Sequence, residues 1–324
     1  NRKEWEELSR GVPVPKSQQL PSFFDEAPKQ CGEAPSQLSV TTAPKFSAPT
    51  TSCRSLPTKS WICTTHVGSL PRPADGNVDD LTKVLQQQQA AAVDIVNDGE
   101  WARDNYIADV IDRIEGLRGG SDEQSATSST ACCQKHAMPT AADMHDVPDY
   151  NKRFTGGNGL ITLNPKRTAT SGLACVSELK YVPADIPSLK PFLDALDKAG
   201  KSPSDAFYSV PSPGTLALFC ENLYFKSHTA YVNALGKALR QEYQRIAATG
   251  LQLQVDCPDL AMGRHTRWSS LSDEEFVEVA KANIAALNEA VADVPVEQVR
   301  VHVCWGNYAG PHHKDMPADL VWPL

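Results

Sequence analysis

The pattern of apolar and polar positions changes at about residue 61. From Trp61 onward, short apolar runs alternate with longer segments in which apolar residues recur at helical spacing. The apolar runs predict six strands, at 61–69, 93–98, 174–182, 206–211, 251–256 and 299–304.

The clearest helical pattern lies between residues 227 and 250, with Gly250 as its stop. Its apolar stripe consists of Val232, Leu235, Leu239, Tyr243 and Ile246. Ser272 and Glu275 form the sequence signature of a capping box, which predicts that another helix begins there. Further helices are expected at 77–92, 104–117 and 187–200.

The alternation of strands and helices predicts an α/β fold with a parallel sheet. Polar residues fall at the C-terminal ends of the predicted strands: Ser69, Asp98 to Glu100, Ser212, Asp256 and the pair His302 and Cys304. That edge is the active-site face of a (β/α)8 TIM-type barrel. An open doubly wound sheet also binds ligands at strand ends, but no glycine fingerprint follows the first strand. We therefore expect the barrel, with only six of its eight β/α units present.

Residues 1–60 differ in composition from the rest, because they are rich in Pro, Ser, Thr and Gln and show no sustained period. This composition predicts an extended or disordered tail. The barrel is expected over 61–324, interrupted by a polar insertion at 118–145.

The 324 residues carry a net charge of −8, which argues against nucleic acid and anionic membranes as partners. No apolar run has the length needed to span a bilayer. The first residues include neither a secretory apolar core nor an initiator Met, so we expect a processed chain or a fragment. Nine cysteines without regular spacing indicate reduced thiols in the cytoplasm or an organelle matrix.

His302 and Cys304 are the candidate metal ligands. In the predicted strand, Val299, Val301 and Val303 share one face, while His302 and Cys304 lie on the other. An imidazole and a thiol side by side form half of a tetrahedral zinc site. Taken alone, the pair is a weak signal, and a buried Cys with a hydrogen-bonded His in a core strand is the favoured interpretation.

Five stretches, in this order and spacing, carry a resemblance to a known family. They are TTHVGSLPRP (64–73), DIVNDGEWARDNYIADVIDRIEG (94–116), PSPGTLALF (211–219), LQLQVDCPDLAMGRH (251–265) and VHVCWGNYAGPHHKDMP (301–317). Together they resemble the cobalamin-independent methionine synthase superfamily, in particular its C-terminal catalytic barrel and its stand-alone thiol methyl- and alkyltransferase relatives.

The resemblance implies zinc-dependent methyl or alkyl transfer to a small thiol of the homocysteine type. His302 and Cys304 match the family's metal ligands. Asp256 matches the aspartate that holds the amino group of the thiol, Glu100 matches a glutamate with a similar task, and Ser69 matches a contact to the substrate backbone. Cys257 stands where relatives more often carry an acidic residue. The donor stays open, with a folate-type methyl donor among the candidates.

The family completes its zinc site with a glutamate and a cysteine that would lie beyond Leu324. Three interpretations follow from this difference. The chain is part of a longer enzyme, or another protein chain covers the open barrel edges and completes the site. Alternatively, the chain is a catalytically inactive barrel, a pseudoenzyme that acts as a structural subunit of a larger complex.

Overall fold

The computed structural model of the chain describes residues 63–70, 80–103, 106–118, 141–155, 173–182, 185–306 and 310–324. The predicted tail at 1–60 lies outside these residues, as do positions 119–140 of the predicted insertion, so both stay predictions.

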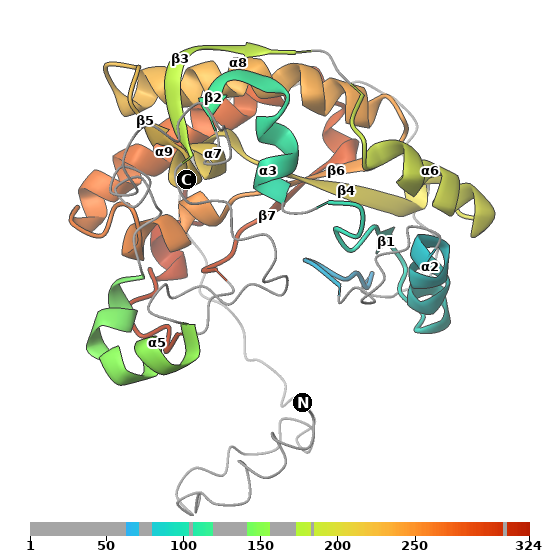
Figure 1. Cartoon of the computed structure of the whole chain (residues 1–324), viewed down its shortest axis with the longest axis horizontal. Coiled ribbons are helices and arrows are strands. Elements are labelled where there is room, and N and C mark those ends of the chain that lie inside the picture. The colour runs from blue at the N-terminus through green and yellow to red at the C-terminus, as the bar shows by residue number, and fades with distance from the viewer. Residues whose placement is uncertain are drawn as a thin grey trace, which may run out of the picture. The chain divides into compact units, whose positions relative to one another are not determined.

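A four-stranded parallel sheet forms the centre of the described structure (Figure 1). Its strand order is β1 (Val96–Asn97), β4 (Ala206–Pro211), β6 (Gln252–Asp256) and β7 (Val299–His302). The parallel α/β architecture is therefore confirmed. The four strands follow one another across the sheet in the same order as along the chain, although β2, β3 and β5 of a second sheet lie between them in the sequence.

The segment before β1 extends this sheet by a single parallel bridge between Thr65 and Ile95. Around it, the Thr64 hydroxyl donates to the Asp94 carboxylate at 3.0 Å, and Leu70 N donates to Gly99 O at 2.9 Å. Among the described residues, β7 pairs only with β6, so no pairing closes the sheet into a barrel.

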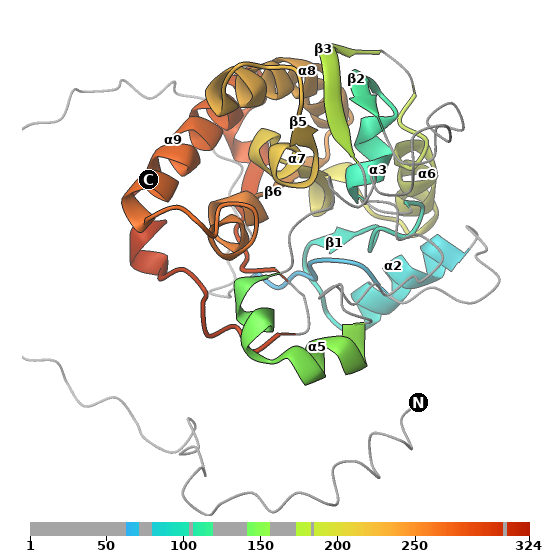
Figure 2. The same ribbon diagram turned by 60° about the vertical axis from the view of Figure 1, so that its left-hand side comes forward.

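Helices cover the sheet in two groups. In Figures 1 and 2, α7 (Pro213–Phe219), α8 (His228–Ala247) and α9 (Asp273–Ala290) lie next to one another. Near β1, α2 (Asp80–Ala90) packs against α6 (Leu189–Lys198). Figure 1 shows α5 (Pro148–Thr155) apart from this pair. None of the described helices combines the length and apolar character that crossing a bilayer requires.

Local sequence determines how the two longest helices begin. The Ser227 hydroxyl accepts from Ala230 N at the start of α8. The chain leaves the helix after Ala247 and reaches Gly250, whose φ of +88° is left-handed. Ser272 and Glu275 form the expected capping box at the start of α9. Their apolar faces enter one hydrophobic core with the buried face of the sheet.

The helix predicted at 104–117 is confirmed over Tyr106–Ile111 (α3), while residues 104 and 105 lie outside the described residues. Its last part was predicted wrongly, because Ile114–Arg118 forms strand β2 instead. The apolar residues 110, 111 and 114 fit both periods, so spacing alone does not separate them. At Gly116, with φ of +94°, an added Cβ would lie 2.4 Å from Glu178 O, a close approach that only glycine permits.

The strand predicted at 174–182 exists but belongs to a different sheet. Strand β3 (Ala174–Tyr181) pairs antiparallel with β2 and parallel with β5 (Glu221–Asn222). The prediction that it is a unit of the barrel sheet is therefore wrong. This second sheet lies against α8. Strand β3 belongs to it because it pairs with β2, a strand that was not predicted from the sequence.

A buried ion pair joins the second sheet to α8. Arg113 Nε donates to Glu242 Oε2 at 3.0 Å, and the Tyr181 hydroxyl donates to the same carboxylate at 2.6 Å. The side chains of Arg113 and Glu242 are only 5% and 1% exposed. Removing one partner of such a pair leaves the other charge buried without compensation.

We expect Glu242→Ala to lower the free energy of unfolding by about 3–5 kcal/mol, because Arg113 keeps its buried charge but loses its main partner. Urea denaturation would measure the loss. Asp194→Asn serves as the matched control: it breaks the exposed Lys190–Asp194 pair and should cost less than about 1 kcal/mol. Equal losses in the two variants would contradict this account.

Candidate functional site

The register of the parallel strands brings three of their ends to the same level. Pro211 of β4 pairs with Asp256 of β6, and Asp256 pairs with His302 of β7. At the next strand, β1 ends at Asn97, and the loop that follows carries Glu100. The expectation that Asp256, Glu100 and His302 come from one edge of the sheet is consistent with this arrangement.

One face of this sheet is polar. Because side chains alternate along a strand, the paired positions Ser209, Gln254 and Arg300 share a face with the pair Asp256 and His302. The opposite face is apolar and enters the hydrophobic core through Tyr208, Val210, Leu253 and Val255. A ligand at this edge therefore meets charged and hydrogen-bonding groups on one side of the sheet.

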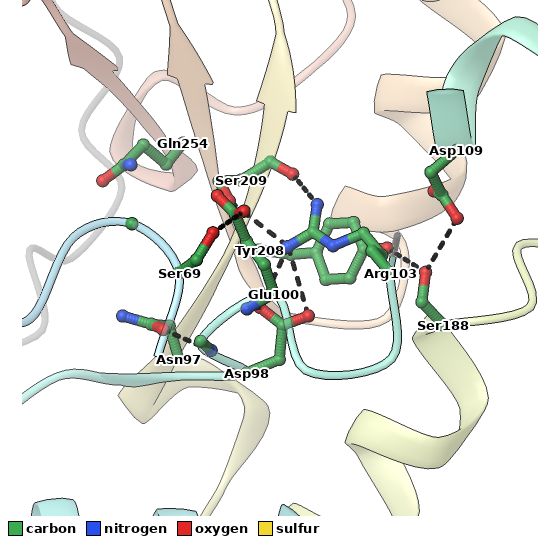
Figure 3. Close-up of polar contacts among 12 residues, drawn as sticks. Ser69, Asn97, Asp98, Glu100, Arg103, Asp109, Ser188, Tyr208, Ser209 and Gln254 are labelled. Atoms are coloured by element: carbon green, nitrogen blue, oxygen red, sulfur yellow. Dashed lines mark hydrogen bonds and ion pairs between the residues drawn. The ribbon is translucent and has the colours of Figure 1, made fainter. Parts of the chain in front are cut away.

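Ser69 and Glu100 lie in contact, although 31 positions separate them. The Ser69 hydroxyl donates to Glu100 Oε2, as Figure 3 shows. Ser69 is exposed and Glu100 is half-buried, so both groups are open to a bound molecule. Both were predicted from the sequence as substrate contacts, and that role stays a prediction.

The loop that carries Glu100 has an unusual backbone. Gly99 and Glu100 both adopt left-handed conformations, with φ of +55° and +56°. The Asn97 side chain accepts from Gly99 N at 2.6 Å, and Asp98 Oδ1 accepts from Glu100 N at 3.2 Å. A non-glycine residue in this conformation costs free energy, so the surrounding bonds must hold Glu100 in place.

Arg103 supplies the strongest of these restraints. Its guanidinium is buried, donates to Asp98 Oδ1 at 2.9 Å and to Ser209 O at 2.5 Å, and lies 4.3 Å from the centroid of the Tyr208 ring. Figure 3 shows it between the loop and β4. Sequence reasoning missed Arg103, because its partner Ser209 is 106 positions away and no local pattern reports that contact.

Asp256 is the most buried of the predicted site residues, with 8% of its surface exposed. Burial raises the pKa of Asp256 to about 7, and the charge of Glu100 acts in the same direction. The hydrogen bond from Gln254 Nε2, at 2.8 Å, opposes this rise. A positively charged group bound here would favour the ionised carboxylate.

His302 and Cys304 are both half-buried at the end of β7. Burial lowers the pKa of His302, as does the charge of Arg300, so its imidazole is neutral and suited to bind a metal. Burial raises the pKa of the Cys304 thiol, which is therefore protonated unless a cation is bound. Among the described residues, no group of three or more His, Cys, Asp or Glu side chains could hold a metal.

The histidines next to these motifs have structural partners. His66 Nε2 lies 2.8 Å from Gly68 O, as expected for a structural hydrogen bond. His312 Nδ1 lies 2.9 Å from Asp315, and His313 Nε2 lies 2.7 Å from Asp146. His312 thus has a side-chain partner within its own loop, whereas His313 contacts a residue 167 positions away.

Curated relatives with detectable sequence similarity are methionine synthases. The chain is 22% identical over 284 residues to the methionine synthase of Sulfolobus acidocaldarius, covering 84% of this chain and 66% of the relative. It is 28% identical over 282 residues to that of Saccharolobus solfataricus, covering 80% of this chain and 68% of the relative. No protein-family model matches the chain.

The fold is also found among solved structures. A B12-independent methionine synthase from Shewanella sp. W3-18-1, in complex with selenomethionine, superposes with a TM-score of 0.51 at 20% identity. The match covers 75% of this chain and 62% of that one. The chain thus spans about two thirds of the length of the proteins it matches.

We expect Gly99→Ala to destabilise the protein more than Gly200→Ala does. Both glycines are left-handed, a conformation that costs other residues about 1–2 kcal/mol, but a Cβ at Gly99 would lie 2.7 Å from the Leu70 side chain, whereas the space at Gly200 is open. The crowding should add about 1–3 kcal/mol at Gly99. Chemical denaturation of both variants would test this, and equal losses would show that the contact with Leu70 is not tight.

Proposed function

Because this chain is a relative of the cobalamin-independent methionine synthase superfamily, we propose that it takes part in methyl transfer to a homocysteine-type thiol. In that reaction the thiol sulfur forms a bond to the methyl carbon of the donor, the donor's bond to that carbon breaks, and the thiol proton is released. The donor is of the folate type or another methyl or alkyl donor. The full barrel fold, with strands in addition to those described, is part of the same proposal.

The observation that carries this proposal is the gathering of Ser69, Glu100, Asp256 and His302 at one edge of a parallel sheet. Glu100 is close enough to Asp256 for its charge to raise the pKa of Asp256. Two neighbouring carboxylates form a suitable site for the ammonium group of an amino thiol, since charge-assisted hydrogen bonds are the strong ones. Ser69 then orients Glu100 and is available to the backbone of the bound amino acid.

Zinc fits the described residues in part. His302 and Cys304 offer the donor atoms that zinc prefers, but a catalytic zinc site has three protein ligands, and the described residues supply no third. We propose that these two residues contribute to a zinc site whose other ligands come from elsewhere in the complete assembly. A bound zinc ion would lower the pKa of a coordinated thiol.

Two observations favour a second candidate function. The described residues offer no group of three potential zinc ligands, and Val301 of β7 is 53% exposed. Both features also suit an inactive barrel that docks onto another protein chain. The two functions are separated by zinc spectroscopy with and without added thiol. A catalytic site exchanges one ligand for the substrate sulfur, whereas a structural subunit shows no change.

We expect His302→Ala and Cys304→Ala each to abolish zinc retention in the intact protein, because each variant removes one of the protein ligands of the proposed site. Metal content after dialysis is the measurement. Cys63→Ala, which removes an exposed thiol, is the matched control and should keep its zinc. Unchanged metal content in the His302 and Cys304 variants would remove both residues from the site.

We expect Asp256→Asn to weaken binding of homocysteine by about 10- to 100-fold, as the loss of a hydrogen bond to a charged group predicts. A thiol of similar length without an amino group should lose little affinity. Asp197→Asn, on the exposed surface of α6, is the control. Equal weakening for both thiols would show that Asp256 does not hold the amino group. Calorimetric titration distinguishes these outcomes.

A further inference from the structure

Arg300 occupies the polar face of the sheet beside the proposed substrate groups. It pairs in register with Gln254, two residues before His302 on the same strand. Its guanidinium lies 4.4 Å from the centroid of the Phe207 ring, and the side chain is half-buried. The aromatic face stabilises the cation and fixes its position.

The Arg300 guanidinium makes no hydrogen bond or ion pair with any of the described residues, and in this it differs from the other arginines. Every other arginine whose side chain is described has a polar partner: Arg103 with Asp98, Arg113 with Glu242, Arg240 with Asp293, Arg245 with Asp185, Arg264 with Asp273 and Arg267 with Leu218 O. A partly buried guanidinium offers five donors and loses hydration without compensation when they are unused.

The nearest acidic group does not satisfy Arg300. Asp256 is close enough for the two charges to interact, but the pair is not within the 4.0 Å of a direct ion pair. Asp256 Oδ1 instead accepts from Gln254 Nε2 at 2.8 Å, which holds the carboxylate. The charge of Arg103, the other cation near the site, is neutralised by Asp98 at 2.9 Å. Arg300 therefore contributes positive charge that is available to a ligand.

We propose that Arg300 is a binding site for an acidic group, a carboxylate or a sulfonate, on the small thiol that the site accepts. A guanidinium binds such groups through two parallel hydrogen bonds. The thiol part of this inference rests on the proposed function, whereas the anion site rests on Arg300 alone. Asp256 lies close enough to interact with the charge of Arg300, and Glu100 acts on Asp256 in turn. The site therefore matches a molecule that carries an amino group and an acidic group together.

The test compares four thiols of similar size on the intact protein. Calorimetric titration with 3-mercaptopropionate and 2-mercaptoethanesulfonate should give affinities at least about tenfold higher than with the uncharged thiols 2-mercaptoethanol and 3-mercaptopropanol. Arg300→Gln should remove the difference. Arg240→Gln, which removes one surface arginine charge on α8, should leave it unchanged. Arg300→Lys keeps the charge without the planar donors and should retain part of the preference.

Equal affinity for the acidic and neutral thiols, unchanged by Arg300→Gln, would overturn the inference and indicate that a protein carboxylate occupies Arg300 in the assembly. If Arg300→Gln does not fold, the ranking of the four thiols on the native protein and on Arg300→Lys decides instead.

Propionate and ethanesulfonate separate this inference from the proposed function, because they lack the thiol. One decisive result is that these anions compete with 3-mercaptopropionate in a manner that depends on Arg300, in a protein that shows no methyl transfer. That result would support the anion site and reject the proposed function. Methyl transfer that proceeds equally well to acidic and neutral thiols, and is unaffected by Arg300→Gln, would reject the anion site alone.

Discussion

Arg103 and Asp98 form a buried ion pair that joins the loop after β1 to the neighbouring strand β4. The guanidinium reaches the backbone of Ser209, while the Asp98 carboxylate also accepts from Glu100 N. The Arg103 guanidinium thus connects β4 to the loop after β1. Through Asp98 it also holds Glu100, whose left-handed backbone directs a carboxylate toward the site. Because the pair is sealed from water and lies on Tyr208, its geometry is fixed by packing as well as by charge.

The rest of the site follows from strand register. The pairing of β4, β6 and β7 places Asp256 beside His302, and a shift of one residue would turn both side chains into the apolar core. The same register places Arg300 on the polar face. The negative and positive groups of the site therefore come from a backbone pattern that the apolar residues of the other face hold in place.

Local signals in the sequence predicted the local features well. The capping box at Ser272, the stripe of α8 and the strands predicted at 206–211, 251–256 and 299–304 depend on residues close together in the chain. The structure has all of them, although the last strand ends at His302. Strand β2 could not be predicted, since its apolar residues fit a helix and its antiparallel partner β3 is distant in the sequence. Arg103 and the sheet of β3 depend on similarly distant partners.

The Thr65–Ile95 bridge leaves Ser69 on a segment with few backbone hydrogen bonds. Local opening costs least where few bonds and few buried contacts must be broken. Residues 63–70 therefore detach from the sheet at a lower free energy than β4 or β6, which are bonded on both sides. Local opening of this segment would expose one wall of the site on the timescale of amide hydrogen exchange, while Asp256 and the buried ion pair stay in place. A small molecule could then enter without unfolding of the protein.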